Sequence, residues 1–84
     1  MWFLHIIMQK VSGYRDPNTL PGSWDNAMVY VTVCGIPTIV GFYEKNIDYT
    51  CRPTRGQFKR IIRAHKAQGW MKMTRHDIRQ TAGI

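Results

Sequence analysis

The segment Thr54–Gly69, TRGQFKRIIRAHKAQG, decides the fold because it combines an apolar face with signals for both ends of a helix. Its apolar face follows the helical spacing i, i+3, i+4 and i+7 and consists of Phe58, Ile61, Ile62 and His65. The hydroxyl of Thr54 is expected to cap the first turn, and Gly69 is expected to end the helix in the left-handed conformation. The sequence therefore predicts an amphipathic helix that packs with one face on the rest of the chain.

The other side of this helix is cationic. It carries Arg55, Lys59, Arg60, Arg63 and Lys66, and no Asp or Glu lies within the segment. Solvated surface helices usually interleave Glu with Lys or Arg, so this much uncompensated charge is unfavourable. The helix dipole favours cations in the last turn, which accounts for Arg63 and Lys66 only. We interpret the stripe as a face for an anionic partner, and the alternative is a merely solvated face.

His65 lies within the apolar face, where two interpretations compete. The favoured one is a half-buried core histidine whose ring bonds to a backbone group. A catalytic or metal-binding role would need convergent partner side chains, and the sequence does not display them.

The charge is distributed unevenly along the 84 residues. The formal net charge is +7, but residues 1–51 hold three Lys or Arg against four acids, whereas residues 52–84 hold nine against Asp77 alone. Such a concentration of cations favours nucleic acid, an acidic protein face or an anionic membrane as partner. A hydrophobic content of 44% suffices for a core, so we expect one folded domain over residues 1–84.

The sequence predicts neither a targeting signal nor a membrane span. The N-terminal run MWFLHIIM lacks a positive n-region and a cleavage site, and it is too short to cross a bilayer. Two cysteines, Cys34 and Cys51, are weak evidence for an oxidising compartment, and we expect reduced thiols. These features predict a cytoplasmic protein. Membrane binding is not expected, because the apolar side of the helix at 54–69 is needed for the core.

Alternating apolar residues predict three strands before the helix, at 2–11, 27–34 and 38–44. The last two would form an antiparallel hairpin across Gly35–Pro37, and the helix would pack on Val29, Val31 and Val33. Segments 12–26 and 45–53 are predicted as connections. The fold class is therefore α+β, a three- to four-stranded antiparallel sheet with one amphipathic basic helix packed on one face.

The segment after the helix allows two interpretations. Residues 70–73 alternate as in a short fourth strand, and residues 75–82 fit a short helix capped by Thr74, with Asp77 at its third position. The tail is expected to fray from about residue 80.

Three aromatic residues are candidates for contacts with a partner. Tyr14 and Trp24 fall in the long predicted loop, and Trp70 follows the helix. Aromatic rings beside cations suit stacking with nucleobases. In the alternative interpretation, Trp24 and Leu20 fold back as a lid over an exposed sheet edge.

The sequence contains no motif for a metal, a cofactor or a phosphate cradle. His and Cys are scattered singly, without C-x-x-C or H-x-x-x-H spacing, so neither a metal nor a cofactor is expected. One enzymatic alternative remains, a small basic endoribonuclease of the toxin type that uses His65 and His76 with nearby Arg and Lys. It requires His65 to face a solvent-accessible cleft.

The predicted function is that of a small basic, non-enzymatic binding protein that engages nucleic acid or an acidic, nucleic-acid-binding protein. Its size and charge are typical of phage or mobile-element inhibitors of host machinery, although it carries no motif of such a family. Homodimerisation through a sheet edge is left open. The candidate binding residues are Arg55, Lys59, Arg60, Arg63, Lys66, Lys72, Arg75 and Arg79.

Overall fold

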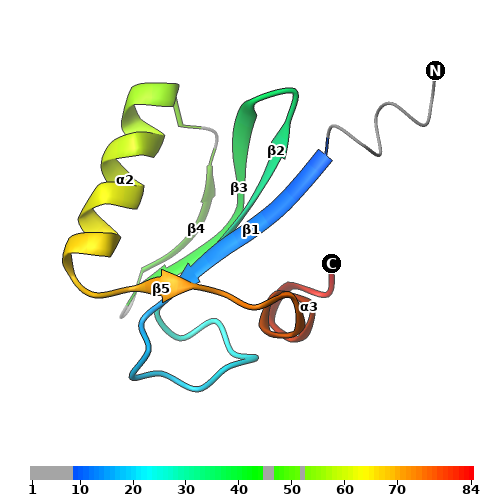
Figure 1. The fold of residues 1–84 in the computed structure, drawn as a ribbon, viewed down its shortest axis with the longest axis vertical. Coiled ribbons are helices and arrows are strands. Elements are labelled where there is room, and N and C mark those ends of the chain that lie inside the picture. Colours follow the sequence, from blue (N-terminus) through cyan, green and yellow to red (C-terminus); the bar gives the residue numbers. More distant parts are fainter. Residues whose placement is uncertain (1–8, 45–46, 52) are drawn as a thin grey trace.

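The computed structural model describes residues 9–44, 47–51 and 53–84 (Figure 1). Their elements follow in the order β1 (Gln9–Arg15), β2 (Ala27–Val33), β3 (Ile36–Glu44), β4 (Ile47–Cys51), α2 (Arg55–Ala67), β5 (Met71–Lys72) and α3 (Arg75–Ala82). The strands form one antiparallel sheet in the order β4-β3-β2-β1-β5, and the basic helix α2 packs on one of its faces. This is the α+β class predicted from the sequence.

The predicted hairpin of β2 and β3 is present, and it lies at the centre of the sheet. Its turn places Cys34 at a φ of 53° and Gly35 at a φ of 81°. Two consecutive residues with positive φ are typical of a type I′ turn, whose twist matches that of the strands it joins. The turn therefore consists of Cys34–Gly35 and not of the predicted Gly35–Pro37, and Pro37 lies within β3.

The strands differ from the prediction mainly at the end of β1 and in the presence of β4. The sequence predicts a loop from residue 12, whereas β1 continues to Arg15 because residues 12–15 pair with β2. The ladder of hydrogen bonds and the burial of Tyr14 outweigh the turn propensity of the local sequence. Residues 2–8 of the predicted first strand lie outside the described residues. Residues 47–51, predicted as a connection, form β4 beside β3.

Helix α2 packs on the sheet face opposite to the predicted one. Its apolar side chains Phe58, Ile61 and Ile62 pack against a buried cluster that consists of Tyr14, Met28, Ile39, Phe42 and Trp70. The prediction of Val29, Val31 and Val33 as partners is wrong, because both faces of β2 are apolar enough to be buried and alternation alone does not choose between them.

Helix α3 covers the face that carries Val29, so the sheet lies between two helices (Figure 1). The second buried cluster consists of Ala27, Val29, Met73 and Ile78. The short strand and the short helix, which the sequence leaves as alternatives, are thus both present, as β5 and α3. Helix α3 follows its N-cap Thr74 and continues to Ala82, where Gly83 ends it with a φ of 73°. The part of the tail that was expected to fray is therefore helical as far as Ala82.

A β-bulge in β3 breaks the simple alternation of side chains. Val29 pairs with Gly41 and Tyr30 pairs with Ile39, so Val40 is the extra residue. As a result Ile39 and Phe42 both join the cluster under α2, while Val40 packs with the second cluster. Alternation without the bulge places Ile39 and Phe42 on opposite faces.

The loop after β1 folds back over the sheet through Trp24. A Cβ atom at Gly41 would lie 2.5 Å from Cη2 of Trp24, so the missing side chain at Gly41 makes room for the ring. The lid considered for Trp24 and Leu20 differs from the prediction: Trp24 covers the inner strand β3 and not a sheet edge, and Leu20 is 79% exposed.

Gly41→Ala is expected to lower the free energy of unfolding by about 1–3 kcal/mol, because the added methyl group collides with Trp24. Gly56→Ala is the matched control, since nothing lies within 4 Å of the Cβ position in this first turn of α2. Alanine is the better helix former, so the control should be as stable as the wild type or more stable. Urea unfolding followed by tryptophan fluorescence measures both variants. Equal midpoints for Gly41→Ala and the wild type would contradict the packing of Trp24.

Candidate functional site

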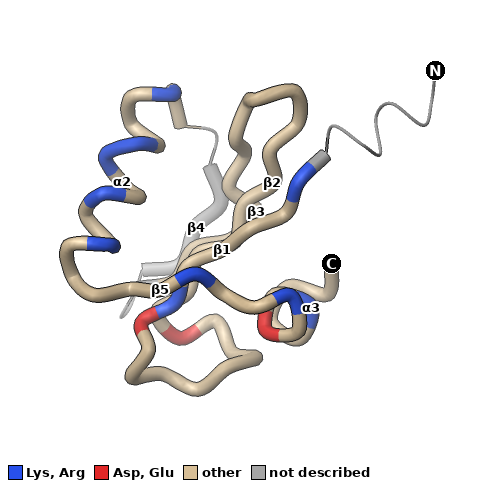
Figure 2. The backbone as a smooth tube through the Cα atoms, in the orientation of Figure 1, with Lys and Arg blue, Asp and Glu red and all other residues tan. Residues whose placement is uncertain are grey.

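The cations of α2 are exposed and lie along one side of the helix (Figure 2). Arg55, Lys59, Arg63 and Lys66 follow the spacing i, i+4, i+8 and i+11, with Arg60 beside them, and we call these five residues the α2 stripe. From its first to its last member the helix rises about 16 Å. No acid lies in the first turn, and no member of the stripe forms an ion pair within the described part of the chain.

Hydrogen bonds fix both ends of the helix that carries the stripe. Thr54 and Gln57 form a capping box, in which Gln57 N–H donates to Thr54 Oγ1 at 3.2 Å and Thr54 N–H donates to Gln57 Oε1 at 3.0 Å. At the other end Gly69 has a φ of 92°, and Trp70 N–H donates to the carbonyl of His65 at 2.9 Å. Both end signals predicted from the sequence are confirmed, and they set the length of the cationic face.

His65 anchors α2 to the sheet. Its ring is buried, its Nδ1 lies 2.9 Å from the carbonyl oxygen of Ile61, and its centroid lies 4.0 Å from that of Trp70 and 5.0 Å from that of Phe42. The favoured interpretation of His65 as a core histidine with a backbone partner is confirmed.

Two cations of the α2 stripe contact the sheet. Arg55 Nη2 donates to the carbonyl of Gly35 at 3.3 Å, and Lys66 Nζ lies 5.7 Å from the centroid of the Tyr14 ring in a cation–π contact. These contacts hold the two ends of the stripe. Lys59, Arg60 and Arg63 lie between them and point their charge into solvent.

A pocket of about 350 Å³ opens beside the first half of the stripe. Tyr30 and Phe58 supply aromatic walls, with ring centroids 4.7 Å apart, and Arg55 and Lys59 supply charge. Burial raises the pKa of the Tyr30 hydroxyl, against a smaller lowering by its hydrogen bond with Ser12, so the group is neutral at physiological pH. The pocket therefore combines a neutral aromatic surface with two cations.

The aromatic residues predicted to contact a partner do not line this pocket. Tyr14 and Trp70 are buried in the cluster under α2, where Trp70 stacks on Phe42 with 6.3 Å between ring centroids. Trp24 covers Gly41 on the other face of the sheet. The rings beside the stripe are those of Tyr30 and Phe58, which sequence patterning assigns to a strand and to a core helix face.

Of the remaining predicted binding residues, Arg75 and Arg79 lie on α3, across the sheet from α2, and Lys72 lies in the edge strand β5 (Figure 2). Together with Lys10 they line a groove of about 500 Å³ between β1, β5 and α3. The sequence interpretation groups all eight predicted cations in one surface, whereas the structure divides them into two. Lys10 is missed because only the pairing of β1 with β5 brings it close to the tail.

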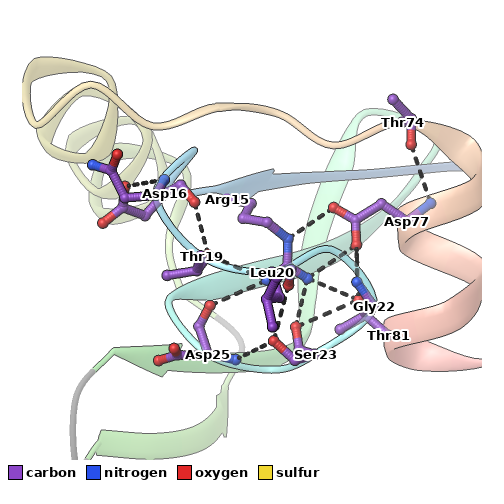
Figure 3. Close-up of polar contacts among 11 residues, drawn as sticks. Arg15, Asp16, Thr19, Leu20, Gly22, Ser23, Asp25, Thr74, Asp77 and Thr81 are labelled. Atoms are coloured by element: carbon purple, nitrogen blue, oxygen red, sulfur yellow. Dashed lines mark hydrogen bonds and ion pairs between the residues drawn. The ribbon is translucent and has the colours of Figure 1, made fainter.

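Arg15 joins the loop and α3 from the inside (Figure 3). Its Nε and Nη2 donate to Oδ2 and Oδ1 of Asp77 at 2.8 and 3.0 Å, and the two side chains are 6% and 7% exposed. Its guanidinium also donates to the carbonyl of Asp25 at 3.1 Å, to the carbonyl of Ser23, and to Thr81 Oγ1 at 2.9 Å. One buried cation thus joins β1 and the loop that follows it to α3, whose Asp77 lies 62 residues further along the chain.

Asp77 accepts hydrogen bonds from several directions. Besides Arg15, its Oδ1 accepts from Gly22 N–H at 2.7 Å and from Thr81 Oγ1 at 3.1 Å. Burial acts to raise the pKa of this carboxyl, but the hydrogen bonds from Arg15, Gly22 and Thr81 outweigh it, and the pKa is lowered. The one acid of residues 52–84 is therefore neutralised internally and does not reduce the charge of the α2 stripe or of the groove.

The sequence interpretation misses this ion pair. It places Arg15 in a surface loop and Asp77 in the cap of the short helix, where Asp77 N–H does donate to Thr74 Oγ1 at 3.1 Å. One feature of the sequence points to the ion pair: Asp77 is the single acid among nine cations in residues 52–84. A lone acid in such a segment is well placed to bind a buried arginine.

The endoribonuclease alternative requires an accessible His65, and the structure does not meet this condition. His65 is buried, whereas His76 is exposed on α3 across the sheet. Among the described residues, no group of His, Cys, Asp and Glu could hold a metal ion, and no helix is long and apolar enough to cross a membrane. The reduced state of Cys34 and Cys51 stays a prediction, since the side chain of Cys51 is not among those described.

Comparison with protein-family models, curated proteins and solved structures finds no match for this chain. Its function therefore has to be inferred from its own geometry.

Asp77→Asn is expected to lower the free energy of unfolding by about 3–5 kcal/mol at neutral pH, because it leaves Arg15 buried without a counter-charge. The folded pKa of Asp77 lies below the unfolded value of about 3.9, so its contribution is present above that value and is lost as the pH falls through the folded pKa. The difference between variant and wild type should therefore shrink in acid. Urea titrations at a series of pH values measure it.

Asp25→Asn serves as the control, because Asp25 is exposed and bonds to Arg15 through its backbone oxygen. Its stability should stay within about 0.5 kcal/mol of the wild type. If the difference in the free energy of unfolding between Asp77→Asn and the wild type is the same at all pH values, the ion pair is ruled out as its source.

Proposed function

We propose that the protein binds nucleic acid through the α2 stripe, by contacts with the phosphate backbone that do not depend on base sequence. The observation that carries the proposal is a row of exposed cations, without an acid among them, on a helix whose opposite face is fixed in the core. Five like charges within about 16 Å of helix repel one another, and a polyanion relieves that repulsion. The stripe is thus stabilised most by a partner with regularly spaced negative charge.

The exposed face of α2 supports backbone contacts better than base readout. Bases are distinguished largely by bidentate Arg, Asn and Gln side chains in a groove. Gln57 is engaged in the capping box, and Arg55 is held by the β2–β3 turn. Only Arg60 and Arg63 of the stripe are then left to read a base edge, and no Asn and no second Gln lies within Arg55–Ala67, so the stripe as a whole suits phosphates, which fix position without reading sequence.

The aromatic pocket beside the stripe supports the same class of partner. Tyr30 and Phe58 provide a surface on which an unpaired base or a sugar can rest while Arg55 and Lys59 hold the adjoining phosphate. Aromatic rings next to cations recur in proteins that bind single strands.

An acidic, nucleic-acid-binding protein is the competing partner, as for a phage or mobile-element inhibitor that acts in the cytoplasm. Stable protein interfaces generally have an apolar or aromatic centre. The large apolar side chains that are exposed in the described part of the chain are Leu20, Val33, Ile36, Met71 and Ile84, and none of them lies on α2. The face of α2 therefore favours a nucleic acid over a protein.

Replacing Lys59, Arg60 and Arg63 together by Gln is expected to weaken binding to a short duplex by at least about tenfold at low salt. These three positions are chosen because the other two members of the stripe also contact the sheet. The slope of log affinity against log salt should become shallower by about 2.7, which is about 0.9 for each lost phosphate contact. Fluorescence anisotropy across a salt series measures both quantities.

The matched control keeps the charge and exchanges the side chains, as Lys59→Arg, Arg60→Lys and Arg63→Lys. It should bind with nearly the affinity and salt slope of the wild type, since phosphate contact depends mainly on charge. If the Gln variant binds the duplex with the affinity of the wild type, the proposal is wrong.

Affinity capture from a cell lysate, with and without nuclease, separates the two classes of partner. Direct binding of nucleic acid predicts that the captured material disappears after nuclease treatment. A protein that stays bound in defined stoichiometry after nuclease would instead favour the inhibitor alternative.

A further inference from the structure

The groove between β1, β5 and α3 is a second concentration of positive charge. Four cations line it, namely Lys10, Lys72, Arg75 and Arg79, and no acid is found among its lining residues. All four side chains are exposed, and none forms an ion pair within the described part of the chain. Asp77 lies on the same helix as the two arginines, but it faces Arg15 and leaves their charge uncompensated.

The groove opens at the β1–β5 edge of the sheet, where Lys10 and Lys72 lie, and onto α3, whose Arg75 and Arg79 lie across the sheet from the α2 stripe. Helix α2 rests on the face of Met28 and Tyr30, and α3 rests on the face of Ala27 and Val29 (Figure 1). With layers stacked about 10 Å apart, the arginines of α3 are separated from the α2 stripe by roughly 20 Å. A duplex is stiff over about 150 base pairs, so a duplex that lies on one surface does not bend around to the other.

We infer that the groove is a second, separate site for the nucleic-acid backbone, and that one molecule thereby holds two segments of nucleic acid on two separate surfaces. This inference rests on the function proposed for the α2 stripe.

The lining of the groove favours the sugar–phosphate backbone as its ligand. Arg75 and Arg79 are one helical turn apart, about 6 Å along the axis, which is comparable with the spacing of consecutive phosphates on a strand. Guanidinium groups bind phosphate in bidentate geometry. Between the cations the lining is aliphatic, with Val11, Met73 and Ile78, and no aromatic ring occurs among the lining residues. The groove can therefore contact sugars and phosphates but offers no ring on which a base would stack.

A sandwich capture tests the inference. One short duplex is fixed to beads, and a second, unattached duplex carries a fluorescent label. The wild type should retain the labelled duplex on the beads. The groove variant, with Lys72, Arg75 and Arg79 replaced by Gln, should still bind a single duplex through the α2 stripe, yet its capture of the labelled duplex should fall by at least about tenfold. Circular dichroism confirms that the variant is folded, as expected for three exposed positions.

The variant with Lys59, Arg60 and Arg63 replaced by Gln gives the complementary measurement. It should also fail to capture the labelled duplex, while weak binding to a single duplex persists through the groove. An equimolar mixture of the two variants should not restore capture, because each molecule then has one working site.

Each contrary result has a definite meaning. Capture by the groove variant equal to that of the wild type would overturn the inference and leave the proposed function standing. Restored capture in the mixture would also overturn it, since pairing of two molecules would then join the duplexes. Single-duplex binding that is unchanged in the α2 variant would reject the proposed function itself.

Discussion

The buried ion pair between Arg15 and Asp77 is the interaction on which the remaining structure depends, because it joins β1, the following loop and α3 at one point. Transfer of two charges out of water costs several kcal/mol for each ion, and this cost is offset only when nearly every donor and acceptor is satisfied. Here the guanidinium meets the carboxylate side-on and also reaches backbone carbonyls of the loop. The main effect of the pair is therefore to fix the position of α3, and its net contribution to stability is smaller.

The position of α3 has a consequence for the surface of the protein. Because α3 is held against the face opposite to α2, the cations of the C-terminal third are divided between two sides of the sheet. Their mutual repulsion is smaller than if all of them shared one surface, since charges separated by more than a Debye length of about 8 Å are largely screened. The arrangement lets a small domain carry a net charge of +7 while each surface remains strongly cationic.

Local signals predicted the helix, its ends and the central hairpin, because each depends on neighbouring residues: the cap at Thr54, the left-handed Gly69 and the alternation in β2. The errors arise where long-range contacts decide. Turn-forming residues 12–15 became strand because β2 pairs with them, and Ile39 changed face because of the bulge. The cations were identified correctly as exposed, but the sequence holds no information on which side of the sheet each would lie. That division depends on Arg15 and Asp77, which are 62 positions apart.

The same separation affects the order of events while the chain is being made. Strand β1 leaves the ribosome early and α3 late, so Arg15 is exposed to solvent until residues 75–82 have been synthesised. A guanidinium cannot be buried without its carboxylate at acceptable cost. The sheet face that α3 covers, with Val29 and Ala27, therefore stays open until α3 has been synthesised, and closure of this half of the core is delayed until that helix has emerged.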